Sequence, residues 1–185
     1  QIINNTLTKN VADTAGGIAI YKANTVVLNT ICWGNSAAHG PEIEMWGGTL
    51  NATYSDICYG AAGIVIDSAA TINWLAGNIV TDPQFADADY RLSDNSFCLG
   101  AGTMSVNIDE QIYTAPISDF AGSARPSPAE SAPDIGAYEN PFDGPGGVRL
   151  VPGIYTTIQA AIDVAEEGDV VLVEDDTYYE NIDFK

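Results

Sequence analysis

A segment that recurs every 24 to 26 residues is the feature that most constrains the fold of this chain. Asn5-Thr6-Leu7 recurs as Asn29-Thr30-Ile31, and Ile31-Cys32 recurs as Ile57-Cys58. A period in the twenties is typical of one structural unit stacked on copies of itself, because a single unit cannot bury its own apolar face. The repeat therefore predicts a solenoid.

Each period contains two short runs that are typical of β-strands. Val26-Val27-Leu28 and Ile64-Val65-Ile66 are rich in β-branched residues, and no capped helix fits between them. We therefore predict an all-β fold and a parallel β-solenoid for the first half of the chain. Asn5 and Asn29 are expected to stack at a turn and to hydrogen-bond along the axis.

Charge is the outlier in an otherwise ordinary composition. The 185 residues include 25 acidic and 6 basic side chains, which gives a formal net charge of −19. Such a field repels nucleic acid and anionic membranes, and it suits divalent cations or a salty extracellular setting. No run approaches the ~20 apolar residues that cross a bilayer. We expect no nucleic-acid partner, no membrane span, and a chain that is a mature product or a fragment.

One amphipathic helix is predicted near the carboxyl end. Residues 156–167 carry apolar side chains at the i, i+3, i+4, i+7 spacing of a helix face. Thr156 or Thr157 can cap the start of this helix, and Gly168 is expected to end it.

Two strands are predicted after this helix, a buried one at Val170–Val173 and an alternating one at Tyr178–Phe184. A helix that leads into strands is what the end of a solenoid needs, because an open coil leaves unpaired backbone groups and an exposed core. We therefore divide the chain into 1–147, which holds the coils and closing loops, and 148–185, which holds a capping helix and first-coil strands.

Motifs from both parts of the chain carry a family resemblance. The segments are 29–35, 54–57, 82–85, 89–92, 96–102, 119–122, 125–126, 133–139, 151–163 and 168–173. They are similar to segments of the secreted right-handed parallel β-helix repeat proteins, a bacterial and archaeal surface group related in fold to pectate lyases. The resemblance implies a right-handed parallel β-helix and an extracellular or cell-surface location.

The order of these motifs departs from the family, because the closing motifs come first and the opening motif comes last. The chain is then a circular permutant, a junction in a tandem array, or a module whose final segment belongs on another subunit. That segment can fold back onto its own open end or complete the open end of a neighbour, and the second arrangement makes a filament. The residues expected at such a contact are Ile158, Ile162, Tyr178, Tyr179, Ile182, Phe184, Ile2 and Ile3.

The sequence contains no recognisable catalytic set. Lyases of the resembling fold use an Arg or Lys base beside calcium-binding carboxylates, and this chain offers few cations, while its one histidine, His39, stands in a turn. We expect no enzyme. Calcium is the candidate ligand, with Asp82, Asp87 and Asp89 as its carboxylates and Glu174–Asp176 as a second cluster, although acidic residues that merely solvate turns are the favoured interpretation. No other cofactor is expected.

Cysteines and aromatic residues leave alternatives open. Cys32 and Cys58 occupy equivalent repeat positions, so they are either stacked thiols or a disulfide, and Cys98 has no obvious partner. The aromatic residues form a strip for sugar stacking or pack on the coils. They are Trp33, Trp46, Trp74, Tyr54 and Tyr59.

The interpretation that follows is a structural extracellular protein, a β-helix subunit that assembles head to tail with copies of itself into a surface fibre, filament or array. The alternative is a polysaccharide-binding or polysaccharide-degrading β-helix that acts through an aromatic or acidic groove.

Overall fold

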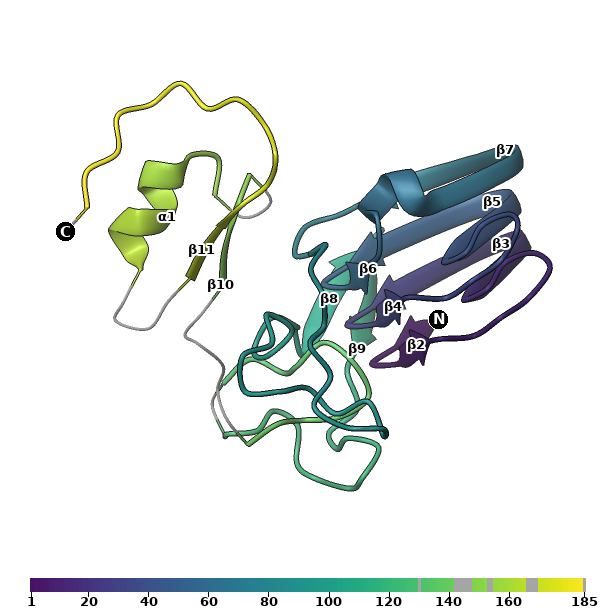
Figure 1. The fold of residues 1–185 in the computed structure, drawn as a ribbon, viewed down its shortest axis with the longest axis horizontal. Helices are drawn as coiled ribbons and strands as arrows, with labels where there is room; N and C mark the ends of the chain where they lie inside the picture. The colour runs from purple at the N-terminus through teal and green to yellow at the C-terminus, as the bar shows by residue number, and fades with distance from the viewer. Residues whose placement is uncertain (130, 142–147, 153–154, 166–169, 185) are drawn as a thin grey trace.

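The computed structural model describes residues 1–129, 131–141, 148–152, 155–165 and 170–184 (Figure 1). The described chain is predominantly β-strand, with parallel sheets and one short α-helix. This β-rich architecture confirms the expectation from the sequence. No helix in the described ranges is long and apolar enough to cross a membrane.

The larger sheet contains four parallel strands that lie one above another in Figure 1. In order across the sheet they are β1 (Ile2–Ile3), β3 (Ile18–Leu28), β5 (Ile43–Thr53) and β7 (Ile64–Trp74). A smaller sheet, also parallel, contains β2 (Thr6–Thr8), β4 (Ile31–Trp33) and β6 (Asp56–Ile57). Each strand of the smaller sheet follows a strand of the larger one, so one repeat contributes a strand to both sheets.

The strand register sets the repeat at 25 residues across β1, β3 and β5, the separation that links Asn4 with Asn29, and at 21 to 22 residues between β5 and β7. Ile18 lies opposite Ile43 in β3 and β5, and the same step relates β1 to β3. This register corrects one prediction. Asn29 Nδ2 donates to Oδ1 of Asn4 at 3.2 Å, so Asn4 rather than Asn5 is the partner that stacks on Asn29.

The main core lies between the two sheets. It gathers buried side chains from β3, β5 and β7 on one side and from β4 and β6 on the other. Its members are Ile18, Ile20, Val27, Cys32, Ile43, Met45, Leu50, Ala52, Ile57 and Ile64. Because neither sheet can bury its apolar face alone, this shared core is what makes the repeats fold as a stack.

The closing segment contains a hairpin that the sequence did not predict. β8 (Ser105–Ile108) and β9 (Gln111–Thr114) pair antiparallel, and Ile108 packs against Val26 and Leu28. The turn residues Asp109 and Glu110 have φ of 50° and 66°. The usual sequence signal of a two-residue hairpin turn is Asn-Gly or Asp-Gly, and the Asp-Glu pair of this turn lacks it.

The last part of the chain forms a small unit of its own, shown in yellow-green in Figure 1. β10 (Val148–Val151) and β11 (Val170–Val173) pair in parallel, and α1 (Ile158–Val164) packs against both. The helix and the first strand are confirmed, but that strand is half-buried rather than buried, and Val173 is exposed. Thr157 is the cap, because its side chain accepts the N–H of Ala160 at 3.1 Å. The helix ends at Val164 with Ala165 as its C-cap, and the predicted stop at Gly168 lies outside the described residues.

The second predicted strand of this unit does not form. Tyr178–Phe184 pairs with no described strand and instead lies against α1. The carboxylate of Glu180 accepts the backbone N–H groups of Ile158 and Gln159, each at 2.8 Å, which satisfies donors at the helix start. The N–H of Asp183 donates to Gln159 Oε1 at 2.7 Å. Side-chain contacts with the helix therefore fix this segment where a sheet was expected.

This unit also contacts the rest of the molecule. Leu172 of β11 packs against a second core cluster, formed by the closing segment together with the smaller sheet. The buried members of that cluster are Ile31, Ile79, Leu92, Cys98, Leu99 and Ile135.

Candidate functional site

The larger sheet has two outer strands, β1 and β7, and no described strand pairs with the outer edge of either. β1 pairs with β3, and none of the described strands pairs with its other edge. The N–H of Asn4 donates to the carbonyl of Leu28 in β3 at 3.0 Å. Because successive residues of a strand face opposite sides, the N–H of Ile3 points away from β3. Ile2 and Ile3, both half-buried, thus lie on an edge able to accept a further strand.

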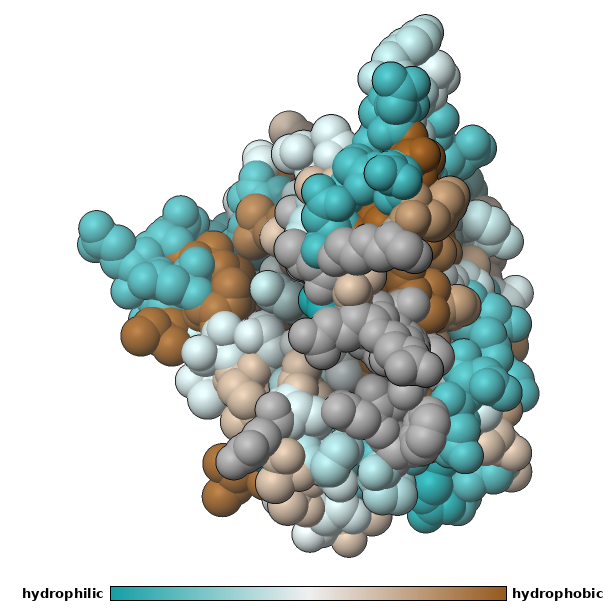
Figure 2. Space-filling view, turned by 90° about the vertical axis from the view of Figure 1, so that its left-hand side faces the viewer, coloured by the Kyte–Doolittle hydropathy of each residue, from teal (hydrophilic) through white to brown (hydrophobic). Residues whose placement is uncertain are grey.

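The opposite end of the molecule carries exposed apolar side chains. Tyr179 is 95% exposed, Phe184 78% and Ile182 42%. Tyr178 is half-buried, and its hydroxyl donates to the carbonyl of Glu174 at 3.1 Å. Figure 2 views the molecule from this side and shows apolar and hydrophilic surface intermixed. Figure 1 places the carboxyl end and the amino end on opposite sides of the molecule.

The predicted assembly residues therefore form two separate groups. The first group is Ile2 and Ile3 on the open edge, and the second lies on the carboxyl-terminal unit. Ile158 and Ile162 belong to the second group and are half-buried on α1. The structure does not bring the two groups together within one chain.

A ladder of side-chain oxygens gives the stack a direction. The N–H of Asn5 donates to Oγ1 of Thr30 at 3.3 Å, that of Thr30 to Oγ of Ser55 at 3.1 Å, and that of Ser55 to Oδ1 of Asn78 at 3.0 Å. Each repeat thus donates to the repeat that follows it. The two ends of the ladder differ chemically, because Asn78 is buried and Asn5 is exposed at the open edge.

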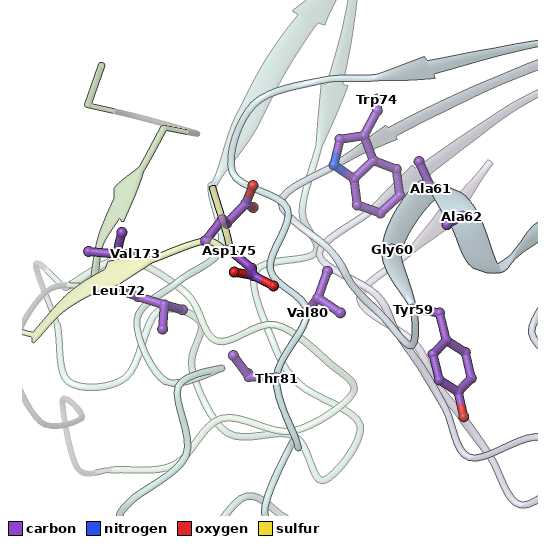
Figure 3. A pocket seen from close by; sticks show the side chains of 11 residues that line it. Tyr59, Gly60, Ala61, Ala62, Trp74, Val80, Thr81, Leu172, Val173 and Asp175 are labelled. Carbon is purple, nitrogen blue, oxygen red and sulfur yellow. The ribbon is translucent and has the colours of Figure 1, made fainter. Parts of the chain in front are cut away.

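A cleft of about 850 Å³ separates the body from the carboxyl-terminal unit. Figure 3 shows Trp74, Val80 and the short turn Gly60–Ala62 on one side, with Leu172, Val173 and Asp175 on the other. Tyr59, Thr81 and Glu174 complete the lining. Of the predicted aromatic strip, Tyr59 and Trp74 share this cleft, whereas Trp33 and Tyr54 pack against core clusters and Trp46 is half-buried in β5.

The acidic loop considered for calcium contains its own cation. Nη1 of Arg91 lies 3.1 Å from a carboxylate oxygen of Asp87 and 3.1 Å from one of Asp89. Hydrogen bonds from the Arg91 backbone and guanidinium hold the pKa of Asp87 below its usual value. Asp82 instead accepts the N–H of Gln84 at 2.9 Å. Within the described ranges no three Asp, Glu, His or Cys side chains are grouped as metal ligands, and calcium stays a prediction.

All three cysteines are buried free thiols. The register places Ile57, not Cys58, opposite Cys32, so the two cysteines are not equivalent as the sequence suggested. Burial raises the pKa of Cys32 and of Cys98, whose Sγ lies 3.4 Å from a carboxylate oxygen of Asp56. These thiols are therefore structural, because a protonated buried thiol is a poor nucleophile.

Some of the remaining candidate site residues were predictable from the sequence, and others were not. His39 is exposed, but it forms an isolated parallel bridge with Thr14 where the sequence predicted a turn. Val80 and Leu172 line the cleft but lie far apart in the sequence, and no local pattern pairs them. The sequence marks Glu174 and Asp175 only as acidic residues, and the fold shows that they line the same cleft as Trp74.

Comparisons with known proteins identify no relative of this chain. No family model matches it, and no curated protein or solved structure matches it either.

Proposed function

We propose that this protein is a structural subunit that assembles head to tail with copies of itself, through its carboxyl-terminal unit and the open edge of β1. Its parallel sheets are the stacked faces of a right-handed parallel β-helix. The assembly is an extracellular or cell-surface filament, a setting that suits the formal net charge of −19.

The open edge of β1 is the observation that carries this proposal. An exposed strand edge offers unpaired N–H and C=O groups and pairs readily with another chain. No described strand, including β10 and β11, covers the outer edge of β1. The apolar side chains beneath it also lack a cover, since Ile2 and Leu7 pack against the main core while staying half-buried.

The segment that can cover this edge is Tyr178–Phe184 of a second copy. It lies free of any described sheet, and Tyr179, Ile182 and Phe184 are exposed. Addition of such a segment to an edge is a common mode of recognition, in which main-chain hydrogen bonds supply affinity and side chains supply specificity.

The two surfaces lie on opposite sides of the molecule, so the contact is heterologous (Figure 1). A heterologous contact leaves one free edge and one free tail at the ends of every oligomer, and it grows into a filament unless the rotation closes a ring. The direction of the side-chain ladder agrees with this geometry, because it makes the two ends chemically distinct.

Sedimentation velocity across a concentration series, followed by electron microscopy of the largest species, tests the proposal. We expect the mean size to rise with concentration and long regular particles to appear. Monodisperse monomers at every concentration would refute it.

A tail variant tests the surface itself. Tyr179→Lys, Ile182→Lys and Phe184→Lys together place charge on exposed positions without disturbing Glu180 or α1, so assembly is expected to fall at least tenfold. The matched control is Val11→Lys, Ile112→Lys and Ile117→Lys, which changes three side chains of 62–82% exposure elsewhere and adds the same charge. Equal loss in both variants would mean that net charge, not the tail, governs assembly.

A mixing experiment separates the two partners. Ile3→Pro removes the outward N–H of β1 but keeps the hydrogen bond between Asn4 and Leu28, since proline is tolerated where an edge strand's N–H faces solvent. This edge variant and the tail variant should each be monomeric alone and form dimers, but nothing larger, when mixed. Longer oligomers in the mixture would contradict the proposed pairing.

A further inference from the structure

The cleft between the body and the carboxyl-terminal unit has an aromatic wall, an apolar floor and an acidic rim. Trp74 is half-buried at the end of β7, where it packs partly against the main core. Val80 and Leu172 supply aliphatic surface from the two sides, as Figure 3 shows. Glu174 and Asp175 add two carboxylates.

The size of this cleft suits a small molecule. Its volume is about 850 Å³, within the roughly 300–1,000 Å³ that is usual for small-molecule sites. Trp74 and Glu174 also line an adjoining hollow of about 290 Å³, which extends the space toward Pro152 and Gly77. A ligand that spans both spaces would keep contact with the same aromatic ring and the same carboxylate.

The charge of the cleft lining favours a positively charged ligand. Its described residues include two carboxylates and no lysine or arginine, and the whole chain has a formal net charge of −19. An anion would lose its hydration without finding a countercharge, whereas a cation would gain two carboxylates and an aromatic face.

We propose that this cleft binds a small organic cation, an ammonium group on an apolar or aromatic body. The ammonium lies between the ring of Trp74 and the carboxylates of Glu174 and Asp175, and the apolar body contacts Val80 and Leu172. Indole is the best of the aromatic side chains for attracting a cation over its face. Thr81 also lines the cleft, and its buried hydroxyl has no hydrogen-bond partner among the described residues.

Calorimetric titration of the full chain with benzyltrimethylammonium tests this proposal. Benzyl alcohol serves as the neutral aromatic comparison, and cellohexaose as a neutral glycan. We expect saturable binding of the ammonium compound that weakens as salt is added, and at least tenfold weaker binding of both neutral compounds. Equal binding of the ammonium compound and benzyl alcohol would overturn the cation site, and so would binding of the glycan alone.

Two variants locate the site. Glu174→Gln with Asp175→Asn changes exposed side chains and should weaken ammonium binding at least tenfold, and Trp74→Ala should do the same. The matched control is Asp109→Asn with Glu110→Gln, a pair of exposed adjacent acids in the β8–β9 turn.

The control removes the same charge, so unchanged binding there shows that the effect belongs to the cleft. Similar loss in the control and in the Glu174 and Asp175 variant would refute the site as a non-specific effect of charge. That acidic variant keeps the test decisive if Trp74→Ala fails to fold. None of these variants alters the tail residues of the assembly test, so loss of ligand binding and loss of assembly are measured independently.

Discussion

Nε of Arg125 lies 2.6 Å from Oε1 of Glu139, and both side chains are almost completely buried. The N–H of Ser127 donates to the other carboxylate oxygen at 3.0 Å, and Arg125 also donates to the carbonyl of Gly136 at 3.2 Å. The pair therefore ties together segments of the closing part that have little regular secondary structure. Burial raises the pKa of Glu139, and the positive charge of Arg125 opposes that rise.

Glu139→Gln should lower the free energy of unfolding by about 3 kcal/mol, because it leaves the buried Arg125 charge without the carboxylate that pairs with it. Urea unfolding followed by circular dichroism measures this change. Arg125→Met with Glu139→Leu removes both charges and should recover most of the loss, since an apolar pair of similar volume needs no countercharge. If the double variant is as unstable as the single one, the unpaired charge of Arg125 is not the cause of the lost stability.

The stability of the protein should depend on pH through Asp134. Burial, with a smaller contribution from the charge of Glu139, raises the pKa of Asp134 to about 7. The folded chain thus binds this proton more tightly than the unfolded chain, so the free energy of unfolding falls as pH rises from about 4 through 7. One proton limits the slope to about 1.4 kcal/mol per pH unit.

Asp134→Asn removes this titration, so the loss of stability between pH 5 and 8, the range to be measured, should become shallower. The exposed Asp67→Asn has the same effect on net charge and is the control. Equal slopes in the wild type and Asp134→Asn, measured by urea unfolding at several pH values, would contradict the assignment.

Gly48 should not tolerate a side chain. Its φ is 91°, and an added Cβ would lie 2.1 Å from the carbonyl oxygen of Ala23 in the neighbouring strand. Gly48→Ala should therefore cost more than about 2 kcal/mol, since backbone strain and a clash act together. Gly34→Ala is the comparison, because Gly34 has a φ of 70° with nothing near the added Cβ and should cost only about 1 kcal/mol. Thermal melting of the two variants gives the difference.

The three thiols should react slowly in the folded protein. Cys32, Cys58 and Cys98 are buried, and burial raises the pKa of each. We expect little labelling by a thiol reagent near neutral pH without denaturant and three labelled thiols per chain in denaturant. A reductant should leave the melting temperature unchanged. Two missing thiols in the denatured chain would instead reveal a disulfide.

The period of the chain was predictable because one stacked unit repeats its own pattern of strands and turns. The strand register was not predictable, because similar residues recur at 24 and 26 positions, while the register is 25 residues between β3 and β5 and 21 to 22 between β5 and β7. The pairing of Asn29 with Asn4 follows from that choice, and Ile57 takes the place opposite Cys32 for the same reason. Register is decided by which side chains reach the shared core, and this is not a local property.

The helix was predictable in type and at its start, since Thr157 and the apolar face of α1 are local signals. The conformation of Tyr178–Phe184 was not predictable. Its alternation is that of a strand, but a strand needs a partner edge, and within one chain Glu180 and Asp183 bind α1 instead. The β8–β9 hairpin was missed because Asp109 and Glu110 form its turn without glycine.

The sequence by itself determined the predominantly β architecture, the approximate spacing of its repeat, the helix near the carboxyl end and the acidic charge, because each of these depends on neighbouring residues or on composition. Only the tertiary structure decided that the edge of β1 stays open, that Arg125 meets Glu139, and that Trp74, Glu174 and Asp175 line one cleft. These relationships join segments far apart in the chain. They exist only where packing against a common core brings those segments together.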